Sequence, residues 1–422
     1  AIRSTLVGGQ AGGTITTGAE NTFIGWTTGA ATTIGNKNVA VGGEALVTNV
    51  AADCNVAVGL EALKAMTSAL TADTFNTAVG YRAGLSVTSG TNNTLMGGQA
   101  GDALTTGSWN VAIGKDALGA TDVGAYNVAV GGQAMLNNVD GSRNTALGYG
   151  ALQSMDPASA VDMYNIAVGF NAGLAVSTGV QNTLIGGLAG DALTTGNYNT
   201  ALGYTALSSE DAHGYNVAIG AYALETLNAG ADAYNTAIGY NAGYPITTGI
   251  NNTIVGGLAG DGITTGNYNV AVGNHALGAE DAHGKNTAIG YGTLSVQNAG
   301  ADAFNTAVGY LAGQGISTGV RNVIIGGQAG DALTTGNHNV ALGFDALSTE
   351  DGHGYNTAIG SQALFLQNAG ADAYNVAMGY RAAYAVTTGV NNIIIGGEAG
   401  LALTTGSYNV AVGHGALATE DT

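Results

Sequence analysis

A Glu-Asp-x-His cluster recurs at 70-residue spacing in this chain. Its residues are Glu210, Asp211 and His213, then Glu280, Asp281 and His283, then Glu350, Asp351 and His353, and Glu420 and Asp421 begin a fourth copy. Carboxylate oxygens beside an imidazole nitrogen are ligands that divalent cations accept in proteins. The same residue types also suit an exposed polar turn that keeps a repetitive chain soluble. The sequence leaves both interpretations open: a repeated divalent-cation site, or a solvated loop without a cofactor.

Catalysis is not indicated by any other residue pattern. No Ser/His/Asp arrangement, phosphate-binding lysine loop or pair of carboxylates typical of a cleft stands out in the sequence. A catalytic site is usually a unique place in a chain, whereas almost every polar feature here occurs several times. We expect the chain not to be an enzyme and to carry no cofactor other than a possible divalent cation.

A short repeat must position these loops. The pattern Asn-x-x-x-Gly, with Thr, Val or Ile second, recurs mostly every 17 residues, with interruptions of 19 or 21. With a degenerate first copy at Ser4-Thr5-Leu6-Val7-Gly8, the chain contains 24 such units. From Asn165 onward, three steps of 17 and one of 19 make a regular 70-residue super-repeat. Accidental low complexity does not hold register over such a length.

The length of the unit decides the fold class. Each unit has an apolar segment of strand length, rich in β-branched residues and bounded by glycine. Helical repeats need about 33 residues or more per unit and avoid this much glycine. We therefore predict an all-β, parallel β-solenoid of about 24 coils, with two short strands in each 17-residue coil. It is expected to run through residues 1–422 as one continuous segment of a longer fibre, irregular over 1–164 and regular over 165–422.

The leading asparagine of each unit is expected to stack on the asparagine of the next coil. Stacked amides can form a ladder along a solenoid, and asparagine tolerates the left-handed backbone of a corner. The glycine four residues later would allow a close approach between coils. The predicted ladder in the regular half comprises Asn165, Asn182, Asn199, Asn216, Asn235, Asn252, Asn269, Asn286, Asn305, Asn322, Asn339, Asn356, Asn375, Asn392 and Asn409.

An aromatic residue often stands directly before this asparagine. The predicted aromatic column is Trp109, Tyr126, Tyr164, Tyr198, Tyr215, Tyr234, Tyr268, Tyr355, Tyr374 and Tyr408. Elsewhere the position holds a cation, at Arg3, Lys37, Arg143, Lys285 and Arg321. Stacked rings with cation–π contacts would stabilise an edge of the solenoid. The alternatives are a sugar-stacking surface for host glycans and, from repeated threonine pairs such as Thr264-Thr265, an ice-binding face.

Charge and composition exclude several functions. The chain has 28 acidic and nine basic residues, a net charge of −19, so it should repel nucleic acid and anionic membrane surfaces. No run of about 18 apolar residues is present that would span a bilayer as a helix. Cys54 is the single cysteine and cannot form an internal disulfide.

The strands themselves favour an oligomer. In a half-buried strand apolar and polar residues alternate, whereas segments such as Thr253–Val255 and Val323–Ile325 are apolar on both faces. The second face needs a cover, and a parallel copy of the chain is the simplest one. Head-to-tail association through open strand edges is a further possibility.

The repeat resembles two known kinds of protein. The core Asn-Thr/Val-Ala-Ile/Val-Gly-x-x-Ala resembles the head repeats of trimeric autotransporter adhesins, which form trimeric left-handed parallel β-rolls. The full 17-residue form, such as Asn199-Thr-Ala-Leu-Gly-Tyr-Thr-Ala-Leu207, is similar to repeats of phage tail fibres. The resemblance implies a left-handed homotrimer located extracellularly or on a virion surface.

The function expected from this resemblance is that of a structural shaft supporting attachment to a host or surface. A phage tail fibre is preferred because adhesin-head units are shorter. The alternatives are a bacterial trimeric surface adhesin, a self-polymerising extracellular filament, and a solenoid that binds glycan or ice through its own side chains.

Overall fold

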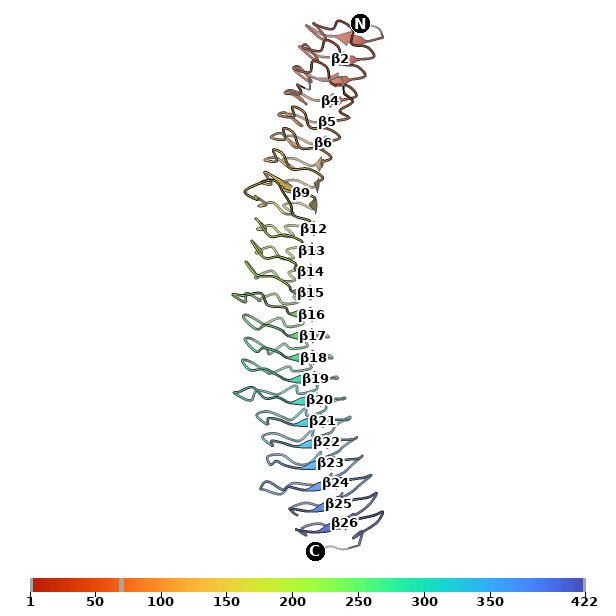
Figure 1. Cartoon of the computed structure of the whole chain (residues 1–422), viewed down its shortest axis with the longest axis vertical. Coiled ribbons are helices and arrows are strands. Elements are labelled where there is room, and N and C mark those ends of the chain that lie inside the picture. The colour runs from red at the N-terminus through yellow and green to blue at the C-terminus, as the bar shows by residue number, and fades with distance from the viewer. Residues whose placement is uncertain (1–2, 68–71, 420–422) are drawn as a thin grey trace. The chain divides into compact units, whose positions relative to one another are not determined.

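The computed structural model describes residues 3–67 and 72–419. It divides the chain into two compact units, Ala1–Gly214 and Tyr215–Thr422. Within each unit a three-residue strand opens every coil, and successive strands lie one above another (Figure 1). No helix is found among the described residues, and hence none long and apolar enough to cross a membrane.

The first unit stacks its main strands in parallel and in register, and two shorter strands, β9 and β11, pair separately. The strands are β1 (Thr5–Val7), β2 (Thr22–Ile24), β3 (Val39–Val41), β4 (Val56–Val58), β5 (Thr77–Val79), β6 (Thr94–Met96), β7 (Val111–Ile113), β8 (Val128–Val130), β9 (Gly141–Ser142), β10 (Thr145–Leu147), β11 (Val161–Asp162), β12 (Ile166–Val168), β13 (Thr183–Ile185) and β14 (Thr200–Leu202).

The second unit repeats the arrangement without interruption. Its strands are β15 (Val217–Ile219), β16 (Thr236–Ile238), β17 (Thr253–Val255), β18 (Val270–Val272), β19 (Thr287–Ile289), β20 (Thr306–Val308), β21 (Val323–Ile325), β22 (Val340–Leu342), β23 (Thr357–Ile359), β24 (Val376–Met378), β25 (Ile393–Ile395) and β26 (Val410–Val412). In the β16–β17 pair, for example, Ala237 lies opposite Ile254. The predicted all-β parallel solenoid of about 24 coils is confirmed.

The prediction of two strands per coil is wrong for most of the described chain. The wall opposite the strands still bonds from coil to coil, as where Gly243 N–H donates to the Ala259 carbonyl oxygen at 2.9 Å. Alternate residues of this wall take the left-handed conformation, with φ of 53° at Asn241 and 59° at Gly243. Because a β-strand needs extended backbone at every residue, this wall is not a regular strand.

The core of each coil is narrow. From β2 on, the middle residue of each three-residue strand points inward and is buried, as are Ala237 and Ile254. The opposite wall contributes a filler such as Ile246 or Leu277. At Gly239 (φ 138°) a Cβ would lie 2.5 Å from the Gly256 carbonyl oxygen of the next coil. The coils therefore approach closely enough at this corner to require glycine.

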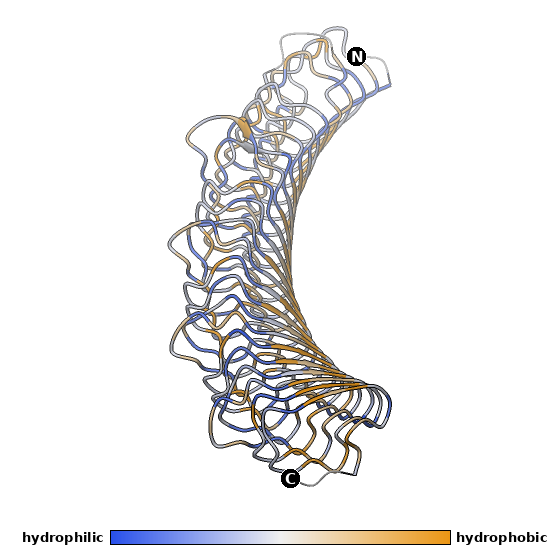
Figure 2. Ribbon diagram, turned by 60° about the horizontal axis from the view of Figure 1, so that its bottom comes forward, coloured by the Kyte–Doolittle hydropathy of each residue, from blue (hydrophilic) through white to orange (hydrophobic). Residues whose placement is uncertain are grey.

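The other two residues of each strand face outward. Ile238, Ile289, Leu342 and Met378 occupy the third strand position in the second unit and are 38–42% exposed. Figure 2 shows the apolar segments of successive coils repeating in register. The outer strand face is thus an apolar stripe that follows the stack within the unit.

Candidate functional site

The ladder asparagines are buried, except for half-buried Asn409, and are hydrogen-bonded from coil to coil. From Asn235 to Asn409 the backbone N–H of each ladder asparagine donates to the side-chain oxygen of the one before, at 2.8–3.3 Å. The side-chain Nδ2 commonly donates to the carbonyl oxygen 14 residues later, as from Asn252 to Gly266 at 2.9 Å. Direct amide–amide contacts occur at some steps, such as Asn409 to Asn392 at 3.1 Å. The predicted ladder is therefore built mainly from side-chain-to-backbone bonds.

The left-handed corner lies one residue earlier than expected. The ladder asparagines are not left-handed, whereas the preceding residue has φ of 52° at Tyr234 and 63° at Tyr355. The expectation that the leading asparagine takes this conformation is wrong. Its side chain must point into the core to reach two backbone partners, so the exposed residue before it makes the turn.

The aromatic residues before the ladder stack on one another. Tyr355 lies 4.9 Å from Tyr374 and 5.0 Å from His338 between ring centroids, with nearly parallel planes. Two bases of the column lie over rings: Lys285 over Phe304 at 5.0 Å, and Arg143 over Tyr126 at 4.8 Å. His338 and Phe304 were missing from the predicted column, although both stand directly before a ladder asparagine. At these steps the ring faces contact their neighbours.

A second aromatic column was missed at the sequence level. It lies five residues after the ladder asparagine and is about half exposed. Its aromatic members include Tyr81, Tyr149, Phe170, Tyr204, Tyr240, Tyr291, Tyr310, Phe344 and Tyr380. Tyr291 and Tyr310 stack with centroids 5.6 Å apart. Each member directly follows the glycine of the repeat, and this fixed position could have revealed the column from the sequence. The column widens the apolar outer face.

The glutamates of the Glu-Asp-x-His clusters lie inside the coils. The side chains of Glu210, Glu280 and Glu350 are fully buried, and the histidine side chains that follow are 28–32% exposed. Each glutamate takes the position eleven residues after the ladder asparagine, which other coils fill with an aliphatic residue such as Ile263. The interpretation of a wholly exposed polar turn is therefore wrong for the glutamates.

In the first unit, buried Asn49 and Asn138 occupy this same position. Their amide makes a hydrogen bond that a carboxylate cannot make. Asn138 accepts from the Gly141 N–H at 2.9 Å and donates to the Gly141 carbonyl oxygen at 3.0 Å. Glu350 Oε1 likewise accepts the His353 backbone N–H at 3.1 Å. The second oxygen, Glu350 Oε2, has no hydrogen-bond partner among the described residues. A carboxylate cannot donate as the amide does, so half of the interaction is lost.

Burial changes the acidity of these groups. Desolvation raises the pKa of Glu280 to about 7, against the lowering effect of hydrogen bonds from His283 and Asn286. The pKa of Glu350 is also raised, chiefly by desolvation. Removing a carboxylate from water disfavours its charged form. A proton or a nearby positive charge is therefore more favourable at Glu280 and Glu350 than at an exposed glutamate.

The neighbouring imidazole and aspartate complete the cluster in two copies. The Nδ1 atom lies 3.5 Å from the glutamate Oε1 in the His213 copy and 3.4 Å in the His353 copy. Ligand atoms of Asp211 and Asp351 lie within 4.8 Å of the other two groups. The structure therefore brings the three predicted residues together at 210–213 and 350–353.

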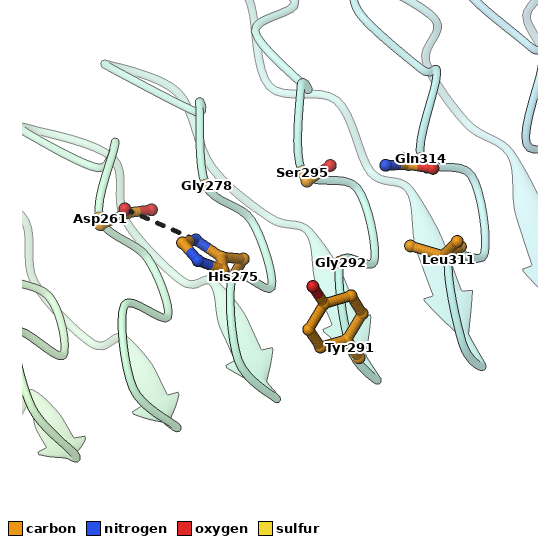
Figure 3. Close-up of a pocket in the computed structure, with 8 residues that line it drawn as sticks. All are labelled: Asp261, His275, Gly278, Tyr291, Gly292, Ser295, Leu311 and Gln314. Atoms are coloured by element: carbon orange, nitrogen blue, oxygen red, sulfur yellow. Dashed lines mark ion pairs between the residues drawn. The ribbon is translucent and has the colours of Figure 1, made fainter.

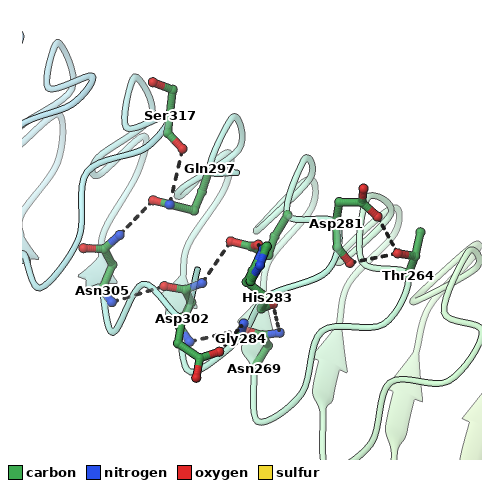
Figure 4. Close-up of polar contacts among 11 residues, drawn as sticks. Thr264, Asn269, Asp281, His283, Gly284, Gln297, Asp302, Asn305 and Ser317 are labelled. Carbon is green, nitrogen blue, oxygen red and sulfur yellow. Dashed lines mark hydrogen bonds and ion pairs between the residues drawn. The ribbon is translucent and has the colours of Figure 1, made fainter. Parts of the chain in front are cut away.

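The copy at Glu280 is arranged differently. The Asp281 carboxylate bonds to the hydroxyl of Thr264 in the preceding coil (Figure 4). His283 Nδ1 lies 3.9 Å from Glu280 Oε1. Only two of the three predicted groups converge here, and the start of a fourth copy, Glu420 and Asp421, lies outside the described residues.

A shallow hollow on the second unit holds a separate carboxylate–imidazole pair. Asp261 and His275 approach within 3.9 Å, and Tyr291, Ser295 and Gln314 from the following coils line the rest (Figure 3). This separation exceeds a hydrogen bond. The hollow offers a polar wall to a small molecule, and its polar groups are spread over successive coils.

Comparisons with protein-family models, with curated proteins and with solved structures found no match to this chain.

Proposed function

We propose that this chain is the structural shaft of an extracellular or virion-surface fibre, formed by three parallel copies that pack their outer strand faces together. The shaft supports attachment to a host or surface, and a phage tail fibre is preferred to a bacterial adhesin because of the 17-residue unit. The left-handed sense is part of the proposal and comes from the resemblance to adhesin heads.

The exposed apolar strand face is the observation that carries the proposal. In the second unit, Tyr240, Tyr291, Tyr310, Phe344 and Tyr380 are about half exposed beside the aliphatic stripe. Since an aromatic side chain buries about 150–250 Å², these five rings alone offer on the order of 500 Å². With the aliphatic residues the surface exceeds the roughly 800 Å² per partner of a stable interface and the roughly 300–600 Å² apolar patch of a typical monomer.

The mass of the chain in solution tests the proposal. Sedimentation equilibrium at micromolar concentration should give three times the mass of one chain. A triple variant, Ile238→Lys, Leu342→Lys and Met378→Lys, places charges on the outer face and should abolish the trimer.

The matched control is Ala301→Lys with Ala371→Lys, in exposed loops of the same unit, and it should remain trimeric. A clean monomer for the unmodified chain would contradict the proposal. An open-ended series of larger species would support the self-polymerising filament instead.

Glycan binding is a second candidate function, supported by aromatic residues of the first column that are more than half exposed, among them Trp109 and Tyr268. Exposed rings are suitable platforms for sugar stacking. Screening the intact chain on a glycan array tests this function, and Trp109→Ala with Tyr268→Ala should abolish any signal. No signal with the unmodified chain would favour a passive shaft.

A further inference from the structure

We propose that Glu350, Asp351 and His353 bind a divalent transition-metal cation of the zinc class, and that Glu210, Asp211 and His213 bind a second. Each set supplies two carboxylate oxygens and one imidazole nitrogen, and leaves one position for water. The proposal does not depend on the fibre function, because each set comes from a single loop of one chain.

The spacing of the ligand atoms supports a shared ion. Zinc–nitrogen and zinc–oxygen bonds are about 2.0–2.2 Å long, so two ligands of one tetrahedral ion lie roughly 3.4 Å apart. His353 Nδ1 and Glu350 Oε1 are separated by 3.4 Å, and the corresponding atoms of His213 and Glu210 by 3.5 Å. Both distances exceed the usual 2.7–3.2 Å of a hydrogen bond from nitrogen to oxygen.

The burial of Glu350 supplies an independent reason for a cation. Its side chain is fully buried, and neither its Oε2 nor the Nδ1 of His353 has a hydrogen-bond partner in the part of the chain that is described. A buried carboxylate oxygen without a hydrogen-bond partner is costly. A cation bound by the Glu350 carboxylate and by His353 Nδ1 would give both groups a partner.

The third ligand also indicates how the ion would enter. Asp351 and Asp211 are exposed, whereas the glutamate beside each is buried, so an ion arriving from solvent would meet the aspartate first. Imidazole suits zinc, nickel and copper, whereas calcium takes six to eight oxygen ligands. The mixed set therefore favours a transition metal.

The Glu280 copy is a comparison site within the same chain. Its imidazole and carboxylate are 3.9 Å apart, and its aspartate bonds to Thr264. With one ligand turned away and the other two further apart, this loop should bind the cation much more weakly. We therefore expect two ions in the part of the chain that the structure describes.

Titration of the chelator-treated, full-length chain with Co²⁺ tests the proposal. Four-coordinate Co²⁺ absorbs visible light intensely, and the absorbance should saturate at two equivalents. His353→Gln and His213→Gln should each remove one equivalent, and the double variant both. His283→Gln is the matched control and should leave both equivalents in place.

Folding is checked separately by circular dichroism. The three histidine side chains are about one-third exposed, so their glutamine variants should fold. Absence of saturable absorbance would overturn the proposal. Equal losses in all three histidine variants would do the same, because they would indicate adventitious histidine binding.

Discussion

The backbone N–H of Asn252 donates to the side-chain oxygen of Asn235 at 2.9 Å, and the same relationship links Asn269 to Asn252 in the next coil. Asn252 Nδ2 also donates to the Gly266 carbonyl oxygen. One buried side chain thus satisfies two backbone groups. We expect Asn252→Leu to lower the free energy of unfolding by about 2–5 kcal/mol, because each unsatisfied buried group costs about 1–3 kcal/mol. Urea denaturation measures the change.

Asn252→Asp distinguishes this explanation from a simple change of shape. The aspartate keeps the acceptor but places a carboxylate oxygen opposite the Gly266 carbonyl, so its destabilisation should shrink as acid protonates the group. Asn298→Ala is the control, since Asn298 is exposed and outside the ladder. Equal stability loss from Asn298→Ala and Asn252→Leu would contradict the role given to the ladder.

Gly239→Ala should destabilise the second unit strongly. The added Cβ would meet the Gly256 carbonyl oxygen at 2.5 Å, at a backbone φ of 138°. Strain from the φ alone is of order 1–3 kcal/mol, and the overlap adds to it, so we expect a loss of about 3 kcal/mol or more. Gly257→Ala is the matched control, because its nearest neighbour would be Asn274 Nδ2 at 3.4 Å. Thermal unfolding of both variants measures the difference. Similar melting temperatures would contradict the prediction, because they would show that neighbouring coils can move apart at little cost.

The chain should be more stable in mild acid than at neutral pH. Desolvation raises the pKa of Asp191, Asp261 and Asp331 above the ordinary value. The folded state therefore retains these protons after the unfolded state has lost them, and stability falls as pH rises through the folded pKa values. The net charge of −19 acts in the same direction. We expect urea midpoints at pH 4.5 to exceed those at pH 7.5.

The aspartates can be tested as the cause. Asp261→Asn with Asp331→Asn removes two of these titrations and should reduce the pH dependence while leaving the fold intact. A midpoint that rises between pH 4.5 and pH 7.5 in the unmodified chain would mean that the lowered pKa values of ion-paired acids such as Glu61 and Asp302 prevail.

Glu350→Leu should stabilise the metal-free chain. Leucine is the native residue at the equivalent position in Leu333 and Leu403, both buried. Replacing a buried charge by a well-packed apolar side chain often gains about 1–4 kcal/mol. A gain would mean that the glutamate costs stability and is present for another reason. A loss measured by urea unfolding at pH 7.5 would instead make Glu350 a structural residue of its turn.

The sequence predicted the solenoid because its period, its glycines and its ladder asparagines are all explicit in the residue pattern. The burial of Glu350 was not predicted, since a run of charged residues suggests solvent; aligning it with Ile263 eleven residues after the asparagine would have revealed an inward position. The sequence also could not show that each coil has one regular strand instead of the two that were predicted. Its cause is positive φ at residues such as Leu258, and leucine carries no sequence signal for that conformation.

Tyr355 and Tyr374 should be energetically coupled. Their rings stack at 4.9 Å between centroids, and such pairs contribute about 0.5–1.5 kcal/mol beyond their buried area. A double-mutant cycle with Tyr355→Ala and Tyr374→Ala, measured by urea unfolding, should give a coupling of about this size. Tyr268→Ala with Tyr374→Ala is the control pair, because these positions lie several coils apart and should be additive. Zero coupling between Tyr355 and Tyr374 would mean that the column does not stabilise the stack, and would leave ligand binding as the better explanation of its exposed rings.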